Sequence, residues 1–340
     1  MIELMRALDT VFDEDWRTFA GMNRNLLLTA ERAAPWFGRR VTGHADGGRS
    51  PGGVVRNEAA LRRLVRSAPR RVVHRTYHPM LDLLPASTTV VETVHDLWDF
   101  VAADERGARA ALRRRLKRRA LARADRIVCV SQSTRDMLGD MFPRLADRAT
   151  VIPHGVRRLS DTPVRVDHGR PFHLFVGQRG RYKNWPIALE ALALVPDAGL
   201  VCFGGGAFSA RELKAIAGLG LGGRVVQVDG DDHRLAGHYE AACALLYPSK
   251  HEGFGLPLLE AMAHGCPVIA SPLTSLPEVG GDAAAYADAD DAEAWANAMR
   301  RIVEDGDLRQ RTIAAGLRRA GEFSWRAAAQ RHATLYRQLG

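Results

Sequence analysis

One stretch of the chain concentrates residue types that could do chemistry: residues 248–260 read Pro-Ser-Lys-His-Glu-Gly-Phe-Gly-Leu-Pro-Leu-Leu-Glu. Glu252 lies in a glycine-bearing loop after an apolar strand, and Glu260 follows in the next helix. Glycines let backbone amides approach a ligand closely, and the helix N-terminus offers amides and a positive dipole to a phosphate. Glu252 could then bind sugar hydroxyls and Glu260 a ribose diol. The alternative is a plain turn carrying two solvated acids.

Lysine is unusual in this chain, because only four of its 48 basic residues are lysines. Lys183 stands at the expected start of a helix, where a cation is disfavoured unless an anion is bound there. An ammonium at that point could stabilise the negative charge that a diphosphate gains as its bond to a sugar breaks. A surface lysine is the alternative.

Two histidines also stand at expected strand ends. His95 follows an apolar strand and His154 lies in a comparable turn, where α/β proteins bind ligands. Each could instead be a core histidine. No histidine joins a metal-binding pattern, and the scattered Asp-x-Asp pairs indicate chance, so we expect neither a metal nor a cofactor. Those pairs are Asp13/Asp15, Asp229/Asp231, Asp288/Asp290 and Asp305/Asp307.

The elements that must position these residues alternate along the chain. Strands are expected over 1–11, 71–73, 88–94, 126–130, 172–176, 199–203, 225–228, 243–247 and 268–270. Helices are expected over 25–34, 57–67, 106–123, 133–141, 185–193, 210–218, 234–242, 258–264, 291–304 and 325–339. Such alternation predicts parallel sheets covered by helices on both faces.

The length of 340 residues suggests two domains. We place the first over 1–158, a polar linker over 159–170, the second over 171–322, and over 323–340 a last helix that returns to the first domain. No long apolar run predicts a membrane-spanning helix. The acidic start of the chain does not resemble a signal peptide, and the four cysteines look like buried thiols, so we expect a cytoplasmic protein.

The motifs together resemble the retaining GT-B glycosyltransferases of family 4. The Glu-x7-Glu spacing of residues 252–260 matches the family signature. Residues 175–184 (Phe-Val-Gly-Gln-Arg-Gly-Arg-Tyr-Lys-Asn) resemble its phosphate loop, residues 204–206 its glycine turn, residues 93–96 (Thr-Val-His-Asp) its His-Asp turn and residues 323–325 (Phe-Ser-Trp) the start of its last helix. One departure is Gln178, where many members carry an arginine.

This resemblance implies two Rossmann-like, doubly wound domains that face each other across a cleft. The C-terminal domain would bind a nucleotide sugar and the N-terminal domain an acceptor. The residues that it implies as catalytic are Glu252, Lys183 and His95. Those implied for donor binding are Gly177, Arg179, Arg181, Gly253, Phe254, Gly255, Leu256 and Glu260. The family's glycine-rich loop on the acceptor side is not clearly recognisable in this sequence. The residues proposed there are Gly21, Asn23, Arg24 and His154.

The implied reaction is transfer of a hexose to a hydroxyl of a glycan or lipid-linked acceptor, with retention and without metal. Likeness to bacterial mannosyltransferases of surface-polysaccharide assembly makes GDP-mannose the first donor to consider. A UDP- or dTDP-sugar remains an alternative, as does a phosphorylase or epimerase on the same fold. Residues 218–223 (Gly-Leu-Gly-Leu-Gly-Gly) satisfy a dinucleotide fingerprint, but they are expected between a helix and a strand, the reverse of the required order.

The charge of the chain points to an anionic partner, since the formal net charge is +9. The cations concentrate over residues 106–126, in a helix whose apolar side is expected to include Leu112, Leu116 and Ala120. This helix could be a plain solvated surface, or it could dock the protein on the inner face of the cell membrane. Nucleic-acid binding is a further alternative that we do not favour, because aromatic residues make up only 7% of the chain.

Overall fold

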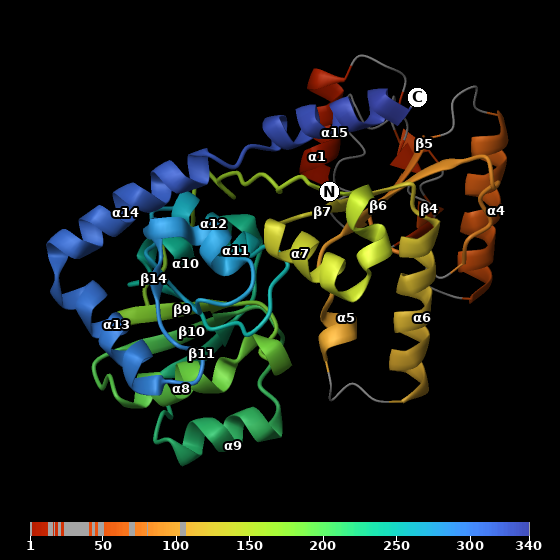
Figure 1. Ribbon diagram of the computed structural model, residues 1–340. Coiled ribbons are helices and arrows are strands. Elements are labelled where there is room, and N and C mark those ends of the chain that lie inside the picture. The colour runs from red at the N-terminus through yellow and green to blue at the C-terminus, as the bar shows by residue number, and fades with distance from the viewer. Residues whose placement is uncertain are drawn as a thin grey trace. The chain divides into compact units, whose positions relative to one another are not determined.

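The computed structural model describes residues 2–12, 16, 18–19, 22–23, 41–42, 45–46, 51–67, 72–79, 81–102 and 107–339. These divide into two compact units (Figure 1). Unit 1 comprises Met1–Gly155 with Trp325–Gly340, and unit 2 comprises Val156–Ser324. The segment expected as a linker over 159–170 therefore belongs to unit 2. The helix expected over 25–34 lies outside the described residues.

Unit 1 is built on a parallel sheet of four strands, in the order β5-β6-β7-β8. These are β5 (Val72–Arg75), β6 (Thr89–Val94), β7 (Arg126–Cys129) and β8 (Ala149–Val151). Two short parallel pairs precede the sheet: β1 (Thr18–Phe19) with β3 (Val41–Thr42), and β2 (Met22–Asn23) with β4 (Ala45–Asp46). The described helical elements between residues 51 and 148 are α4 (Pro51–Ser67), α5 (Trp98–Val101), α6 (Ala108–Arg123), α7 (Gln132–Met141) and η2 (Pro143–Arg148). Ser131 caps α7 by accepting a hydrogen bond from the backbone amide of Thr134.

The start of unit 1 corrects one expectation, because residues expected as a strand form helix α1 (Ile2–Val11). Leu4 and Leu8 stand one helical turn apart and are both buried. They pack in one core with Ala329 and Ala333 of α15 (Trp325–Leu339), and Figure 1 shows α1 beside α15. A helix places its apolar residues on the single face that α15 covers, whereas a strand would divide them between two faces.

Unit 2 contains a parallel sheet of six strands, in the order β11-β10-β9-β12-β13-β14. The strands are β9 (Phe172–Val176), β10 (Gly199–Phe203), β11 (Val225–Val228), β12 (Leu245–Tyr247), β13 (Val268–Ala270) and β14 (Ala285–Tyr286). The chain starts at β9, builds outward to β11, and returns to the other side of β9 with β12. The order of the sheet thus reverses between β9 and β12, and ligands of doubly wound folds bind beyond the carboxyl ends of strands at such a point.

Helices cover this sheet and close the core of unit 2. They are η3 (Arg181–Lys183), α8 (Trp185–Ala193), α9 (Ala210–Gly218), α10 (Asp232–Ala241), α11 (Leu256–Ala263), α12 (Leu276–Gly280), η4 (Gly281–Ala283), α13 (Ala292–Glu304) and α14 (Gly306–Gly321). The sequence prediction omitted α14. Trp185 of α8 and Trp295 of α13 are buried against Leu200 and Leu246 of the sheet. Residues 218–223 run from the last residue of α9 toward β11, which confirms that they do not form a strand-to-helix dinucleotide turn.

The segment after residue 155 is fastened to unit 2 by polar contacts. The Arg158 guanidinium donates to the carbonyl of Ala263 at 2.9 Å, and the backbone amide of Leu159 donates to Nε2 of His264 at 2.9 Å. Ser160 Oγ lies 2.8 Å from Nδ1 of His233. These contacts explain why a polar, aperiodic stretch is ordered within unit 2.

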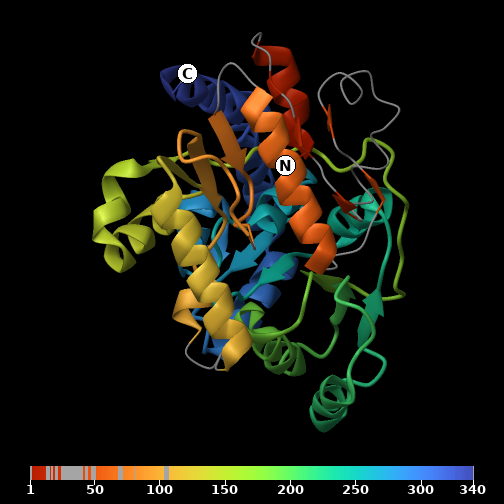
Figure 2. The same cartoon turned by 90° about the vertical axis from the view of Figure 1, so that its right-hand side faces the viewer.

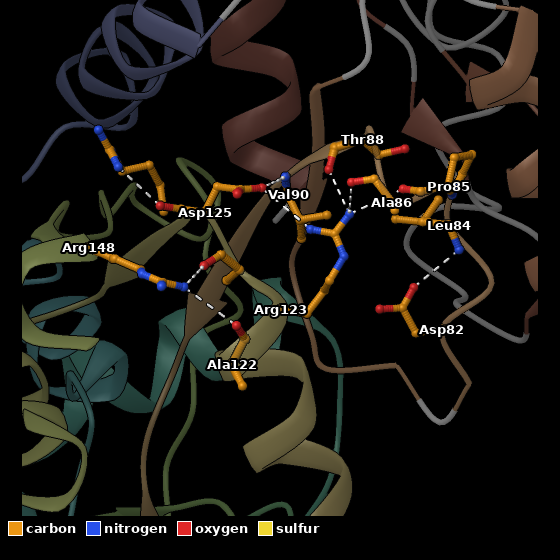
Figure 3. A network of polar contacts seen from close by, with 12 residues as sticks. Asp82, Leu84, Pro85, Ala86, Thr88, Val90, Ala122, Arg123, Asp125 and Arg148 are labelled. Atoms are coloured by element: carbon orange, nitrogen blue, oxygen red, sulfur yellow. Dashed lines mark hydrogen bonds and ion pairs between the residues drawn. The ribbon is translucent and has the colours of Figure 1, made fainter. Parts of the chain in front are cut away.

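Helix α6 differs from its expected orientation. Its buried residues are Ala110, Lys117, Ala120 and Leu121, whereas Leu112, expected to face the core, is 52% exposed. The carboxyl end of α6 is held by the contacts in Figure 3. Arg123 donates to the carbonyls of Thr88 at 2.7 Å and Pro85 at 3.2 Å, and Arg148 donates to that of Ala124 at 3.0 Å. Within the described part of the chain, no helix is long and apolar enough to cross a membrane.

Candidate functional site

Lys183 and Glu252 meet in unit 2 at the point where the sheet order reverses. Lys183 ends η3 after β9, and Glu252 lies in the loop between β12 and α11. The Lys183 ammonium donates to Oε1 of Glu252 at 2.6 Å, and both side chains are largely buried. Helices α8 and α11 begin beside these residues, and neither has a side-chain cap at its N-terminus. The site thus combines an ion pair with two helix N-termini, which favour anions.

Two backbone positions explain why the sequence folds this way locally. Asn184, directly after Lys183, has φ 52°, a left-handed conformation that asparagine tolerates. Its Nδ2 donates to the carbonyl of Ala289 at 2.7 Å, which anchors the turn that carries Lys183. Gly255 is the N-cap of α11 and has φ 98°, and a Cβ there would lie 2.9 Å from Leu276 Cδ2. A side chain at Gly255 would therefore disturb the start of the helix.

Three residues that the sequence prediction missed hold Lys183 and Glu252. The Lys183 ammonium donates to the Tyr247 hydroxyl at 3.2 Å and lies 4.9 Å from the centre of that ring. The backbone amide of Glu252 donates to Thr274 Oγ1 at 3.0 Å, and Ser275 Oγ donates to the Glu252 carbonyl at 3.0 Å. Burial and the neighbouring Glu252 raise the pKa of Tyr247 well above its usual value. A tyrosine ending an apolar strand was the available signal for Tyr247; nothing in the sequence marked Thr274.

The glycine turn after β10 is organised by Arg179. Its guanidinium donates to the carbonyls of Gly204 at 3.0 Å and Gly206 at 2.7 Å, and its Nε donates to Glu212 at 2.8 Å. A Cβ on Gly205 would lie 2.7 Å from both Arg179 Nη1 and the Gly177 carbonyl. This close approach requires glycine. Arg179 is thus buried and committed to protein carbonyls and a carboxylate, instead of presenting its charge at the surface.

The other residues predicted for donor binding belong to two loops, one after β9 and one after β12. Gly177 has φ 101°, and its amide donates to the Phe203 carbonyl at 2.9 Å. Gln178 is exposed, and Arg181 lies in η3, with its side chain outside the described set. Gly253 is buried, and the buried Phe254 packs edge-on against Phe323, with ring centres 5.8 Å apart. Leu256 is the first residue of α11.

Glu260 has a separate environment on α11. It is the fifth residue of that helix and accepts a hydrogen bond from the Tyr239 hydroxyl at 3.2 Å. The Tyr239 ring is fully buried and stacks on His264, with centres 6.0 Å apart. Burial raises the pKa of Glu260, and the hydrogen bond from Tyr239 partly opposes that rise. Glu260 is therefore a restrained carboxyl with one fixed donor, unlike the ion-paired Glu252.

His95 and His154 come together in unit 1, after β6 and β8. His95 Nε2 donates to the Thr76 carbonyl at 2.8 Å, which requires its proton on Nε2. Its Nδ1 lies 3.3 Å from Nε2 of His154, and the rings stack with centres 5.4 Å apart. Burial lowers the pKa of both histidines, that of His154 to about 3. Since both are then neutral near pH 7, His154 Nε2 donates and His95 Nδ1 accepts.

Of the four residues predicted for the acceptor side, Asn23 and His154 belong to the described part of the chain. Asn23 ends the short strand β2, while Gly21, Arg24 and the side chain of Asn23 lie outside the described set. His154 also contacts Trp325 of α15, with ring centres 5.4 Å apart. Among the side chains that the structure describes, no group of three or more His, Cys, Asp or Glu is placed to hold a metal ion.

Comparison with known proteins gives two family matches in succession. A Glycosyltransferase Family 4 model matches residues 24–158, and a Glycosyl transferases group 1 model matches residues 157–319. The boundary between the matches falls close to the start of unit 2 at Val156.

Individual relatives are similar over parts of the chain. The O-antigen chain mannosyltransferase B of Escherichia coli is 47% identical over 94 residues, 28% of this chain and 25% of that protein. A GDP-mannose-dependent alpha-(1-6)-phosphatidylinositol dimannoside mannosyltransferase of Mycobacterium tuberculosis is 34% identical over 233 residues, 64% of this chain and 59% of that protein. Each of these alignments spans less than two thirds of the relative's own length.

Solved structures share the fold at low identity. HepE of Anabaena, in complex with UDP and glucose, matches 99% of this chain and 95% of its own, with a TM-score of 0.75 and 17% identity. Because the two family models together run from residue 24 to residue 319 and the fold is shared, the chain belongs to the glycosyltransferases and has the GT-B fold, with two parallel-sheet α/β units.

Proposed function

We propose that this protein is a retaining glycosyltransferase that moves a hexose from a nucleotide sugar to a hydroxyl group. The observation that carries the proposal is the contact of 2.6 Å between the Lys183 ammonium and the Glu252 carboxylate. It lies where the order of the unit 2 sheet reverses, beside the N-termini of α8 and α11. A cation and two helix N-termini suit a diphosphate, and an adjacent carboxylate suits the hydroxyls of a sugar.

In the proposed reaction the bond between the anomeric carbon and the diphosphate oxygen breaks, and its electron pair stays on the diphosphate. Lys183 stabilises this developing charge through a charged hydrogen bond. The acceptor oxygen bonds to the same face of the anomeric carbon, and its proton passes to an oxygen of the leaving phosphate. Glu252 holds the sugar and Glu260 the ribose. Lys183 supplies the positive charge, so the proposal requires no metal ion.

Lys183 and Glu252 exchange each other for new partners when the nucleotide sugar binds. In the ligand-free geometry Lys183 and Glu252 neutralise each other at 2.6 Å. A diphosphate would attract the ammonium away from the carboxylate, and Glu252 would then accept from sugar hydroxyls. Tyr247 and Thr274 keep contacts with Lys183 and Glu252 that do not depend on the ion pair. They support the two residues during this exchange.

We assign acceptor binding to unit 1, and we propose that His95 donates or accepts a hydrogen bond with a substrate hydroxyl. The chain of hydrogen bonds from His154 through His95 to Thr76 supports this role, because it fixes the orientation and tautomer of His95. The acceptor is a hydroxyl of a glycan or a lipid-linked glycan. Relatives named as mannosyltransferases of O-antigen chains and of a phosphatidylinositol dimannoside support this class.

GDP-mannose is the donor that we propose, because one relative is named as GDP-mannose-dependent and another as a mannosyltransferase. HepE, which is less similar, was solved with UDP and glucose, so a UDP-sugar is the second candidate. A melting-temperature screen against GDP-, UDP- and dTDP-sugars distinguishes them. A ligand at 100 times its Kd stabilises the folded state by about 2.7 kcal/mol.

The reaction itself needs its own test. The protein is incubated with the donor that raises its melting temperature and with candidate glycan acceptors, and NMR then reads the anomeric configuration of the product. We expect an acceptor-dependent product with the configuration of the donor, and undiminished turnover in EDTA. An inverted product would contradict the retaining mechanism. Loss of activity in EDTA, with rescue by Mg²⁺ or Mn²⁺, would contradict metal independence.

A further inference from the structure

Helix α6 of unit 1 carries a concentration of charge that the proposed reaction does not use. Its sixteen residues include seven arginines and one lysine, with no aspartate or glutamate. In Figure 2 the length of α6, drawn in gold, faces the viewer without another described element of unit 1 over it.

Some of the cations serve the fold. Lys117 is buried, and its ammonium lies 3.3 Å from Oδ2 of Asp99 and 3.6 Å from Oδ1 of Asp96. Arg113 contacts Asp99 at 3.2 Å, and Arg123 holds the loop at residues 85–88 (Figure 3). These three residues explain part of the basic composition of α6 without any partner.

Four other residues form what we call the outer face of α6: Arg109, Leu112, Arg115 and Arg119. Their spacing of three, three and four residues places them along one side of a helix, and all four are exposed. Among the described residues, none of these three arginines has an ion-pair partner. Leu112 is 52% exposed in the middle of the row, and Val101, at the end of the neighbouring α5, is 40% exposed.

We propose that the outer face of α6 docks the protein on an anionic lipid bilayer. Arginines reach phosphate headgroups, while a leucine between them enters the boundary between headgroups and acyl chains. A nucleic acid fits less well, because α6 contains no aromatic side chain on which a base could stack. The apolar part is a single leucine, so binding is peripheral and reversible.

The expected strength of membrane binding follows from the number of exposed cations. One surface cation near anionic lipid strengthens binding roughly fivefold, which corresponds to about 1 kcal/mol. Loss of three cations should therefore weaken binding roughly 100-fold. Salt should have a comparable effect, because the Debye length falls to about 3 Å near 1 M ionic strength.

The test is sedimentation of the full chain with phosphatidylcholine vesicles that contain or lack phosphatidylglycerol. We expect binding to the anionic vesicles only, and release by salt. The variant Arg109→Gln/Arg115→Gln/Arg119→Gln should lose this binding, and Leu112→Gln should weaken it several-fold. Both variants should keep the melting temperature of the wild type.

The matched control is Arg301→Gln/Arg311→Gln/Arg318→Gln, which removes the same charge from exposed positions of unit 2. It should bind anionic vesicles as the wild type does. Equal weakening by both triple variants would overturn the proposal in favour of net charge alone. Failure of the wild type to bind anionic vesicles at low salt would also overturn it, as would binding of duplex DNA in preference to the vesicles.

Discussion

The two polar clusters of this protein use opposite electrostatics. In unit 2, Lys183 and Glu252 form an ion pair beside two helix N-termini. In unit 1, His95 and His154 are joined by a hydrogen bond between rings whose pKa values burial lowers, so both are neutral near pH 7. One cluster concentrates charge and the other suppresses it.

This difference corresponds to the demands of the proposed reaction. A leaving diphosphate gains negative charge, which a fixed cation stabilises. A sugar or acceptor hydroxyl is neutral and needs directed hydrogen bonds, which a histidine of fixed tautomer supplies. If the comparison is right, substitutions in unit 2 should act through charge and those in unit 1 through orientation and proton binding.

The largest effect is expected from Lys183→Ala. Loss of a charged hydrogen bond worth about 1.5–3 kcal/mol should lower kcat/KM roughly 10- to 150-fold. Lys183→Arg should recover part of the loss, because it keeps the charge but changes its geometry. Steady-state transfer assays measure this, with the exposed Lys214→Ala on α9 as the control. Wild-type turnover of Lys183→Ala would remove the charge argument.

Glu252 and Glu260 should respond differently to loss of charge. Glu252→Gln should mainly lower kcat, by roughly 10-fold or more, because the sugar changes shape and charge in the transition state. Glu260→Gln should mainly raise the KM of the donor, since ribose contacts change little during the reaction. Separate measurement of kcat and donor KM decides this. Wild-type values for both variants would contradict the assignment of the site.

His154→Phe should act through the pH dependence of stability. In the wild type, the pKa of His154 is about 3 in the folded protein and about 6.5 in the unfolded chain. Between these two pH values the unfolded chain therefore binds more protons than the folded one. The free energy of unfolding should therefore fall as pH decreases from about 6.5. His154→Phe should lessen the loss between about pH 7 and about pH 5 by about 1–2 kcal/mol, while raising the KM of the acceptor. Urea unfolding at both pH values tests this, and an unchanged pH slope would refute it.

The smallest effect on turnover is expected from Glu92→Gln, in the sheet of unit 1. Burial raises the pKa of Glu92 to about 8, so the folded chain holds a proton that the unfolded chain releases above about pH 4.3. Wild-type stability should therefore fall between about pH 4.3 and about pH 8. Glu92→Gln should remove this fall, so its stability relative to wild type should rise as pH increases, and turnover should stay unchanged. A variant that is less stable than wild type at pH 8 would show that the carboxylate is needed there.

Local patterns predicted most elements of unit 2 and fewer of unit 1. The predicted bounds are confirmed for two strands and one helix of unit 2: Phe172–Val176, Gly199–Phe203 and Trp185–Ala193. Each is a short apolar run or a periodic segment between turn residues. The prediction was wrong at the start of the chain, where a strand was expected. Ile2–Val11 is rich in apolar residues, and only packing against α15 selects a helix there.

The sequence by itself determined the residue types and spacing of the Glu252–Glu260 string, the unusual Lys183 and the alternation that makes two parallel-sheet units. These are local properties. Only the tertiary structure decided that Lys183 meets Glu252, 69 residues away, because that contact depends on β9 and β12 being neighbours in the sheet. It also decided that Arg179 binds the glycine turn and that Leu112 faces outward. The physical reason is that a side chain's partners depend on which elements pack against its own, and residue spacing does not contain that information.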